Sequence, residues 1–195
     1  MERDRTYLFY ELMNYPCPKQ KEFFAYGQEL PHEREIQTGY SWETACPVLE
    51  EFREVITRHE RLWKSLPFIE SIYICNSMSF NALKDDSDID LFFVVKNGRM
   101  RTARFRSTVM LLVLGIKRIG KWIRKKFCLS FYVTTSHIDL QPIRLNPYDP
   151  YLVYWLAHLV PLYHERMDDP TDIYEANFWL RSYLPNFPME QVIDV

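Results

Sequence analysis

The stretch from Phe68 to Val95, FIESIYICNSMSFNALKDDSDIDLFFVV, decides how the fold is interpreted. It opens with a β-branched and aromatic run, passes through small polar residues and an acidic loop, and closes on a second apolar run. Such runs are typical of buried strands. We therefore predict strands over 69–77 and 88–95. Asn76 and Ser77 tolerate turn and helix-cap geometry, so a turn and a short helix should follow the first strand.

Two carboxylates, Asp88 and Asp90, stand at the start of the second predicted strand. Residues two apart on a strand project from the same face, so these side chains should lie side by side, with Ile89 on the other face. Two parallel carboxylates repel each other unless a cation lies between them, and Mg²⁺ in proteins takes one or two carboxylates plus substrate phosphates. The pair therefore predicts a site for Mg²⁺ or Mn²⁺. The plainer interpretation is a solvated strand end.

The order of strand, small-residue turn, short helix and Asp-x-Asp strand resembles the DNA polymerase β-like nucleotidyltransferases. More narrowly, the chain is similar to small bacterial nucleotidyltransferase-domain proteins, through LPFI at 66–69, ICNS at 74–77, DDSDIDLFFVV at 85–95 and CLSFY at 128–132. The resemblance covers about residues 58–132 and extends more faintly to 176–187. It implies an enzyme that moves a nucleoside monophosphate from a nucleoside triphosphate, ATP among them, to a hydroxyl on RNA, a protein or a small molecule.

The resemblance also implies roles for individual residues. Asp88 and Asp90 would be the catalytic metal ligands, Asn76 and Ser77 would lie against the triphosphate, and either Asp86 or Ser87 would orient the acidic loop. Arg101 and Arg104 are three apart on a predicted helix, so they share a face that could reach the phosphates. The alternative for both arginines is pairing with Asp85 and Asp86.

Two departures from the family pattern are visible. Asn76 stands where the family usually has Gly, although Asn is the other residue that best tolerates positive φ. The predicted strand 127–135, FCLSFYVTT, lacks the third carboxylate that these enzymes generally use, and Ser130 occupies the expected position. The missing carboxylate favours a second hypothesis, a catalytically degenerate nucleotidyltransferase fold that binds nucleotide, RNA or a protein.

Length and composition fit one compact unit. The 195 residues include 47% hydrophobic and 16% aromatic residues, which excludes a disordered chain. We expect an α/β (α+β) fold, in which a small mixed sheet is flanked by N- and C-terminal helices: a helical region at 1–65, the nucleotidyltransferase core at 66–140 and a helical region at 141–195. Apart from the strand at 127–135, helices are predicted at 6–15, 19–30, 48–66, 100–119, 151–165 and 172–184.

The cysteines and the apolar runs indicate the compartment. The four cysteines show no CxxC spacing and are interpreted as reduced thiols of a cytoplasmic protein. The start of the chain lacks the apolar region of a signal peptide, and the longest apolar run, 109–114, is too short to span a bilayer. We therefore expect no membrane partner.

The charge of the chain is strongly segregated. Eleven of the 24 basic residues lie between Lys96 and Lys126, where no acidic residue occurs, so the rest of the chain carries 13 basic against 26 acidic residues. This asymmetry indicates a surface for polyanions, either the triphosphate or nucleic acid. A solvated basic face that offsets acidic neighbours explains the cluster at 117–126 equally well.

Overall fold

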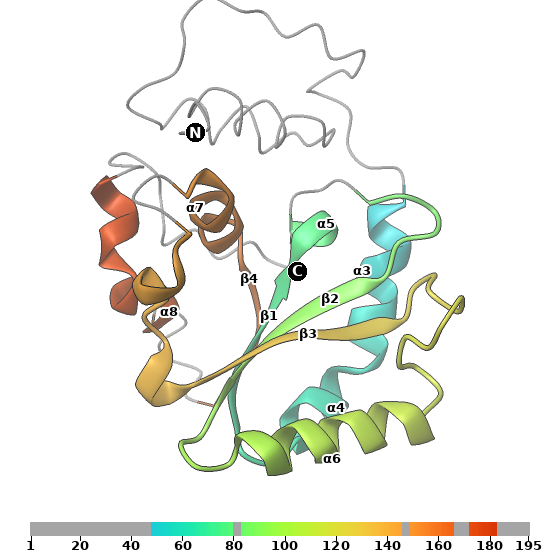
Figure 1. The fold of residues 1–195 in the computed structure, drawn as a ribbon. Coiled ribbons are helices and arrows are strands. Elements are labelled where there is room, and N and C mark those ends of the chain that lie inside the picture. Colours follow the sequence, from blue (N-terminus) through green and yellow to red (C-terminus); the bar gives the residue numbers. More distant parts are fainter. Residues whose placement is uncertain (1–47, 80–82, 146–148, 166–171, 183–195) are drawn as a thin grey trace, which may run out of the picture.

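The computed structural model describes residues 48–79, 83–145, 149–165 and 172–182 (Figure 1). Four strands form one mixed sheet in the order β3-β2-β1-β4. They are β1 (Ile69–Cys75), β2 (Ile89–Val95), β3 (Phe127–Thr134) and β4 (Val160–His164). β1 is antiparallel to both β2 and β4, whereas β2 and β3 are parallel. The α+β fold with a small mixed sheet is thus confirmed. The three strands predicted from sequence are β1 and β2 at its centre and β3 at one edge.

The helices divide between the two faces of the sheet (Figure 1). One face carries α3 (Leu49–Arg58), α4 (Glu60–Ser65) and α6 (Met100–Val113), and the other carries α7 (Pro150–Ala157) and α8 (Asp172–Ala176). The short α5 (Asn76–Ser79) follows β1, and 3₁₀ turns cover Thr135–His137, Gln141–Ile143 and Phe178–Ser182. Each helix of the described part is too short or too polar to cross a membrane.

Alternation along the strands creates a separate core under each helical layer. On the α6 face, Ile72, Leu91 and Phe93 pack with Phe52 and Trp63 from α3 and α4. On the α7 face the sheet contributes a different set, which packs with Trp155, Leu156 and Ile173. That set comprises Tyr73, Cys75, Phe92, Val94 and Val133. Both faces of the sheet are therefore covered by helices, and the two central strands are almost entirely buried.

Four sequence expectations about helices are wrong. The predicted helix 172–184 ends at Ala176 and is followed by the 3₁₀ turn Phe178–Ser182. The predicted helix 48–66 is interrupted at His59 and forms α3 and α4. The predicted helix 100–119 ends at Val113, because Gly115 adopts φ +66°, a conformation that glycine reaches without steric cost. The predicted helix 151–165 ends at Ala157, and Val160–His164 forms the edge strand β4, with Pro161 paired opposite Tyr73. The predicted helices 6–15 and 19–30 lie outside the described residues.

Candidate metal and phosphate site

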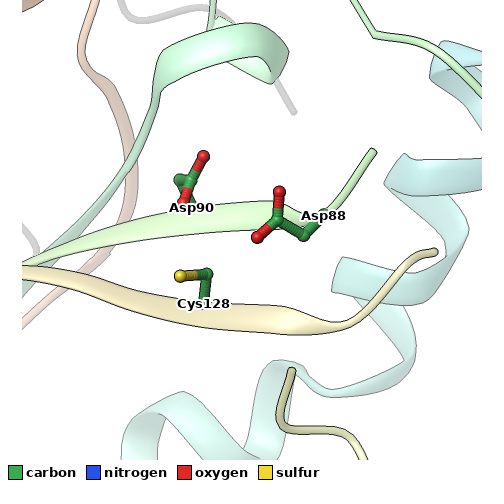
Figure 2. A group of neighbouring side chains, drawn as sticks. All are labelled: Asp88, Asp90 and Cys128. Carbon is green, nitrogen blue, oxygen red and sulfur yellow. The ribbon is translucent and has the colours of Figure 1, made fainter. Parts of the chain in front are cut away.

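The candidate site lies where β2 and β3 begin. Asp88 directly precedes β2, and Asp90 is its second residue. Ile89 between them is fully buried in the α6-face core, so the two carboxylates belong to the α7 side of the sheet. Figure 2 shows both carboxylates projecting to the same side of the strand. The prediction that Asp88 and Asp90 share a face is confirmed.

Cys128 completes a group of three donors. In the sheet register Asp90 pairs with Cys75 of β1 on one side and with Cys128 of β3 on the other. One carboxylate oxygen each from Asp88 and Asp90 and the Cys128 Sγ lie within 4.8 Å of one another, and all three residues are half-buried (Figure 2). The parallel pairing of β2 with β3 brings the thiol to the carboxylates, a contact that no spacing in the sequence indicated.

Ser130 lies beside Asp90 because of a β-bulge. Leu91 pairs with Leu129 and Phe92 pairs with Phe131, so Ser130 is the extra residue of β3. Its hydroxyl donates a hydrogen bond to Asp90 Oδ1 at 2.5 Å. The position where the resemblance places a third carboxylate therefore adjoins Asp90. Asp139, in contrast, lies beyond the far end of β3, away from the site.

Arg118 supplies the positive charge at the site. Its Nη1 donates to Asp88 Oδ2 at 2.6 Å, and the Asp88 side chain is only 13% exposed. The backbone fixes this arginine, since Arg118 N–H bonds to the Phe127 carbonyl at 2.9 Å. The Asp88 carboxylate raises the pKa of the Arg118 guanidinium above its ordinary value. Arg118 belonged to the 117–126 cluster in the sequence, where it was not distinguished from its neighbours.

Burial and charge also perturb the thiol. Burial raises the pKa of Cys128, and the nearby Asp90 carboxylate adds to this rise, while the hydrogen bond with Ser130 opposes it. The thiol form is favoured as a result. Burial raises the pKa of Cys75 still more strongly, so this neighbour in the register is an inert core thiol.

The predicted turn residues adjoin the site from β1. Asn76 has φ +58°, the left-handed conformation that its sequence position predicted, and its Oδ1 accepts a hydrogen bond from Trp155 Nε1 at 2.9 Å. Ser77 follows in α5, half-buried, and α5 packs beside β2. Ser87 fastens the acidic loop, because its Oγ accepts from Lys84 N–H and its carbonyl accepts from Lys125 N–H, both at 2.9 Å.

The two predicted arginines are not brought to this site. α6 covers the opposite face of the sheet, and it begins after the carboxyl end of β2, whereas Asp88 and Asp90 lie at the amino end. Arg104 lies over the ring of Tyr132, 5.7 Å from its centroid, and Arg101 is exposed on the same helix. The alternative pairing with the acidic loop is also wrong, since Asp85 forms its ion pair with Arg124 at 3.6 Å.

The basic cluster 117–126 is partly offset by acids of the chain. Lys125 pairs with Glu51, and Arg124 lies 3.6 Å from Glu51 and from Asp85. Together with the Arg118 and Asp88 pair, these contacts favour the interpretation of a basic face that balances acidic neighbours over part of the cluster.

The chain matches no protein-family model and no curated protein.

Proposed function

We propose that the chain is a metal-dependent nucleotidyltransferase that moves a nucleoside monophosphate from a nucleoside triphosphate to a hydroxyl acceptor on RNA, a protein or a small molecule. One observation carries the proposal: Asp88 and Asp90 project side by side from the start of β2, beside the Arg118 guanidinium and at an end of the sheet that solvent reaches. Phosphoryl chemistry needs positioned phosphates and offset charge more than covalent help from the protein.

The donor set fits a hard divalent cation through its oxygens. Carboxylates suit Mg²⁺ and Mn²⁺, and one or two of them usually suffice when substrate phosphates supply the remaining ligands. Asp88 and Asp90 would hold the ion, whose chemistry there is to neutralise charge on the triphosphate. The Cys128 thiol is a soft donor and does not add to magnesium affinity.

The proposed transfer forms one bond to the α-phosphorus and breaks another, and residues of the chain would offset the charge on the phosphates. The acceptor hydroxyl oxygen forms a bond to the α-phosphorus, the bond from that phosphorus to the bridging oxygen breaks, pyrophosphate leaves, and the hydroxyl proton passes to water. Arg118 is the cation placed to offset the charge on the phosphates, a role that the sequence resemblance had suggested for Arg101 or Arg104. Ser77 and the turn at Asn76 adjoin the carboxylates from β1 and would contact the phosphates.

A second candidate function is a catalytically degenerate fold that binds nucleotide, RNA or a protein without turnover. The observation in its favour is that β3 offers Cys128 and Ser130 at the site and no carboxylate. Both carboxylates also have partners within the chain, Asp88 in Arg118 and Asp90 in Ser130.

Label transfer separates the two candidates. Purified protein is incubated with each α-labelled nucleoside triphosphate, Mg²⁺ or Mn²⁺, and pooled RNA and protein acceptors. The enzyme transfers label, Asp88→Asn/Asp90→Asn abolishes transfer, and the matched pair Asp85→Asn/Asp86→Asn in the exposed loop preserves it. Metal-dependent triphosphate binding in equilibrium dialysis, with no transfer to any acceptor, would assign the binding module instead.

A further inference from the structure

Large apolar side chains are exposed over one short segment, residues 105–122. Seven of the ten large hydrophobic residues that are exposed in the described part of the chain fall within it: Phe105, Val109, Leu112, Val113, Leu114, Ile119 and Trp122. The exposed fractions reach 81% for Val113 and 78% for Trp122. Single exposed apolar residues are ordinary, whereas several in one short segment mark a surface that contacts something apolar.

Helical geometry gathers the first four of these residues into a stripe. Ala103, Ser107 and Leu111 form the buried row of α6 against the sheet. Phe105, Val109, Leu112 and Val113 recur at spacings of four, three and one, on the opposite side of the helix. The apolar second half of α6 therefore faces solvent along its outer side.

A tight turn holds two more apolar side chains next to each other. Ile119 and Trp122 form an antiparallel bridge, with Trp122 N–H bonded to the Ile119 carbonyl at 3.0 Å. Gly120 takes φ +53° at the tip, where Lys121 is exposed. The turn thus presents a tryptophan and an isoleucine as a fixed pair beyond the end of α6.

Positive charge surrounds the apolar residues. No acidic residue occurs between Lys96 and Lys126, and the described ion pairs of this stretch involve only Lys96, Arg118, Arg124 and Lys125. Arg101, Arg106 and Lys121 are exposed in or beside the segment without an acidic partner among the described residues. The occupant must therefore combine negative charge with an apolar interior.

That combination distinguishes the possible occupants. A nucleic acid satisfies the charge and leaves the stripe in water. A second copy of this chain that meets the first through the same segment, across a two-fold axis, brings basic residues against basic residues. Basic residues beside exposed Trp, Phe and aliphatic side chains are characteristic of surfaces that lie on anionic bilayers. Trp side chains favour the depth of the lipid headgroups.

We propose that the segment 105–122 docks the protein on an anionic lipid bilayer, with the α6 stripe and the Ile119–Trp122 pair entering the headgroup region. This peripheral contact revises the sequence-based expectation of no membrane partner, which rested on the lack of an apolar run long enough to span. The proposal is independent of nucleotidyl transfer, since α6 lies on the opposite face of the sheet from Asp90.

Vesicle flotation of the full chain tests the proposal. The vesicles contain either phosphatidylcholine alone or phosphatidylcholine with about a third phosphatidylglycerol. The protein is expected to float with the anionic vesicles, to bind neutral vesicles at least tenfold more weakly, and to lose most binding when salt is raised from about 0.1 M to 1 M, where the Debye length falls from ~10 to ~3 Å.

Matched surface variants assign the contact to the segment. Val113→Ser/Trp122→Ser should weaken partition at least tenfold, whereas Leu145→Ser, which removes an equally exposed leucine elsewhere, should leave it unchanged. Arg101→Gln/Lys121→Gln should weaken binding to anionic vesicles, and Arg58→Gln/Arg61→Gln on α3 and α4 should not. All these side chains are exposed, and circular dichroism checks that each variant is folded.

Three results would overturn the proposal. The first is failure of the wild type to float with anionic vesicles, and the second is equal loss of binding in the segment variants and in their controls. The third is a vesicle-independent partner for the same residues. It would show as self-association in sedimentation that Val113→Ser/Trp122→Ser removes, or as RNA binding tighter than vesicle binding at equal salt.

Discussion

Ser130→Asp is the substitution that tests the geometry of the candidate site most directly. Ser130 Oγ lies 2.5 Å from Asp90 Oδ1, so an aspartate there places a second carboxylate against Asp90. Two unit charges about 4 Å apart repel by about 1 kcal/mol in bulk water and about 4 kcal/mol at an effective dielectric constant of 20. Ser130 is exposed, so we expect the lower part of that range, about 1–2 kcal/mol.

The expected result is a metal-dependent change in unfolding temperature. For a chain of this size about 1 kcal/mol corresponds to roughly 2–4 °C. Ser130→Asp should therefore unfold about 2–8 °C below Ser130→Asn in EDTA. Both variants lose the serine hydroxyl, so the difference between them isolates the charge. In about 10 mM Mg²⁺ or Mn²⁺ the difference should close or reverse, because an ion that binds only the native state stabilises it.

Thermal unfolding followed by circular dichroism measures this difference, with ionic strength balanced by NaCl so that general screening is equal in both conditions. Equal unfolding temperatures for the two variants in EDTA would mean that residue 130 does not face Asp90. A gap of the expected size that Mg²⁺ and Mn²⁺ leave untouched would mean that the carboxylates hold no divalent cation, and the metal-dependent function would then be refuted.

Three further outcomes follow from the described contacts. Arg118→Gln should lower label transfer at least tenfold and destabilise the fold by less than about 1 kcal/mol, since the Arg118 side chain is 41% exposed; Arg101→Gln should change transfer less than twofold. Phe92→Ala should lower the free energy of unfolding in urea by about 3–5 kcal/mol, because Phe92 is fully buried. Because the pKa of Cys128 is raised, its alkylation by iodoacetamide should be slow at pH 8 and should become faster as the pH rises through that pKa; mass spectrometry follows the reaction. Asp90→Asn removes a carboxylate that favours the thiol form, so the plot of alkylation rate against pH should shift to lower pH.

Local sequence patterns were sufficient to predict the two central strands and the pairing of Asp88 with Asp90 on one face. Strand periodicity fixes which side chains share a face, so Asp88 and Asp90 could be placed together without knowing any neighbour. The same holds for Asn76, whose tolerance of positive φ is a property of the residue itself, and which adopts φ +58° in the structure. These predictions depend on residues a few positions apart.

The remaining features depend on contacts between distant segments. Cys128 and Arg118 join the site because β3 pairs in parallel with β2, a register that no local pattern specifies. Arg101 and Arg104 follow the Asp-x-Asp strand closely in sequence and were predicted to reach the phosphates, but α6 lies on the other face of the sheet. Pro161 lies within the predicted helix 151–165, yet proline is acceptable in an edge strand, which β4 is.

Under the proposed function, the contacts of the two carboxylates within the chain couple the binding of the cation to the binding of the triphosphate. Arg118 Nη1 donates to Asp88 Oδ2 at 2.6 Å, so a metal cation that binds without triphosphate must break this hydrogen bond and is repelled by the guanidinium charge. A triphosphate that draws Arg118 onto its own oxygens removes this competition and adds phosphate ligands for the same cation. Each ligand therefore strengthens the binding of the other, and linkage makes the coupling equal in both directions. In Arg118→Gln the cation alone should bind more tightly than in the wild type, while the gain from adding triphosphate should shrink, a pattern that a purely structural arginine would not produce.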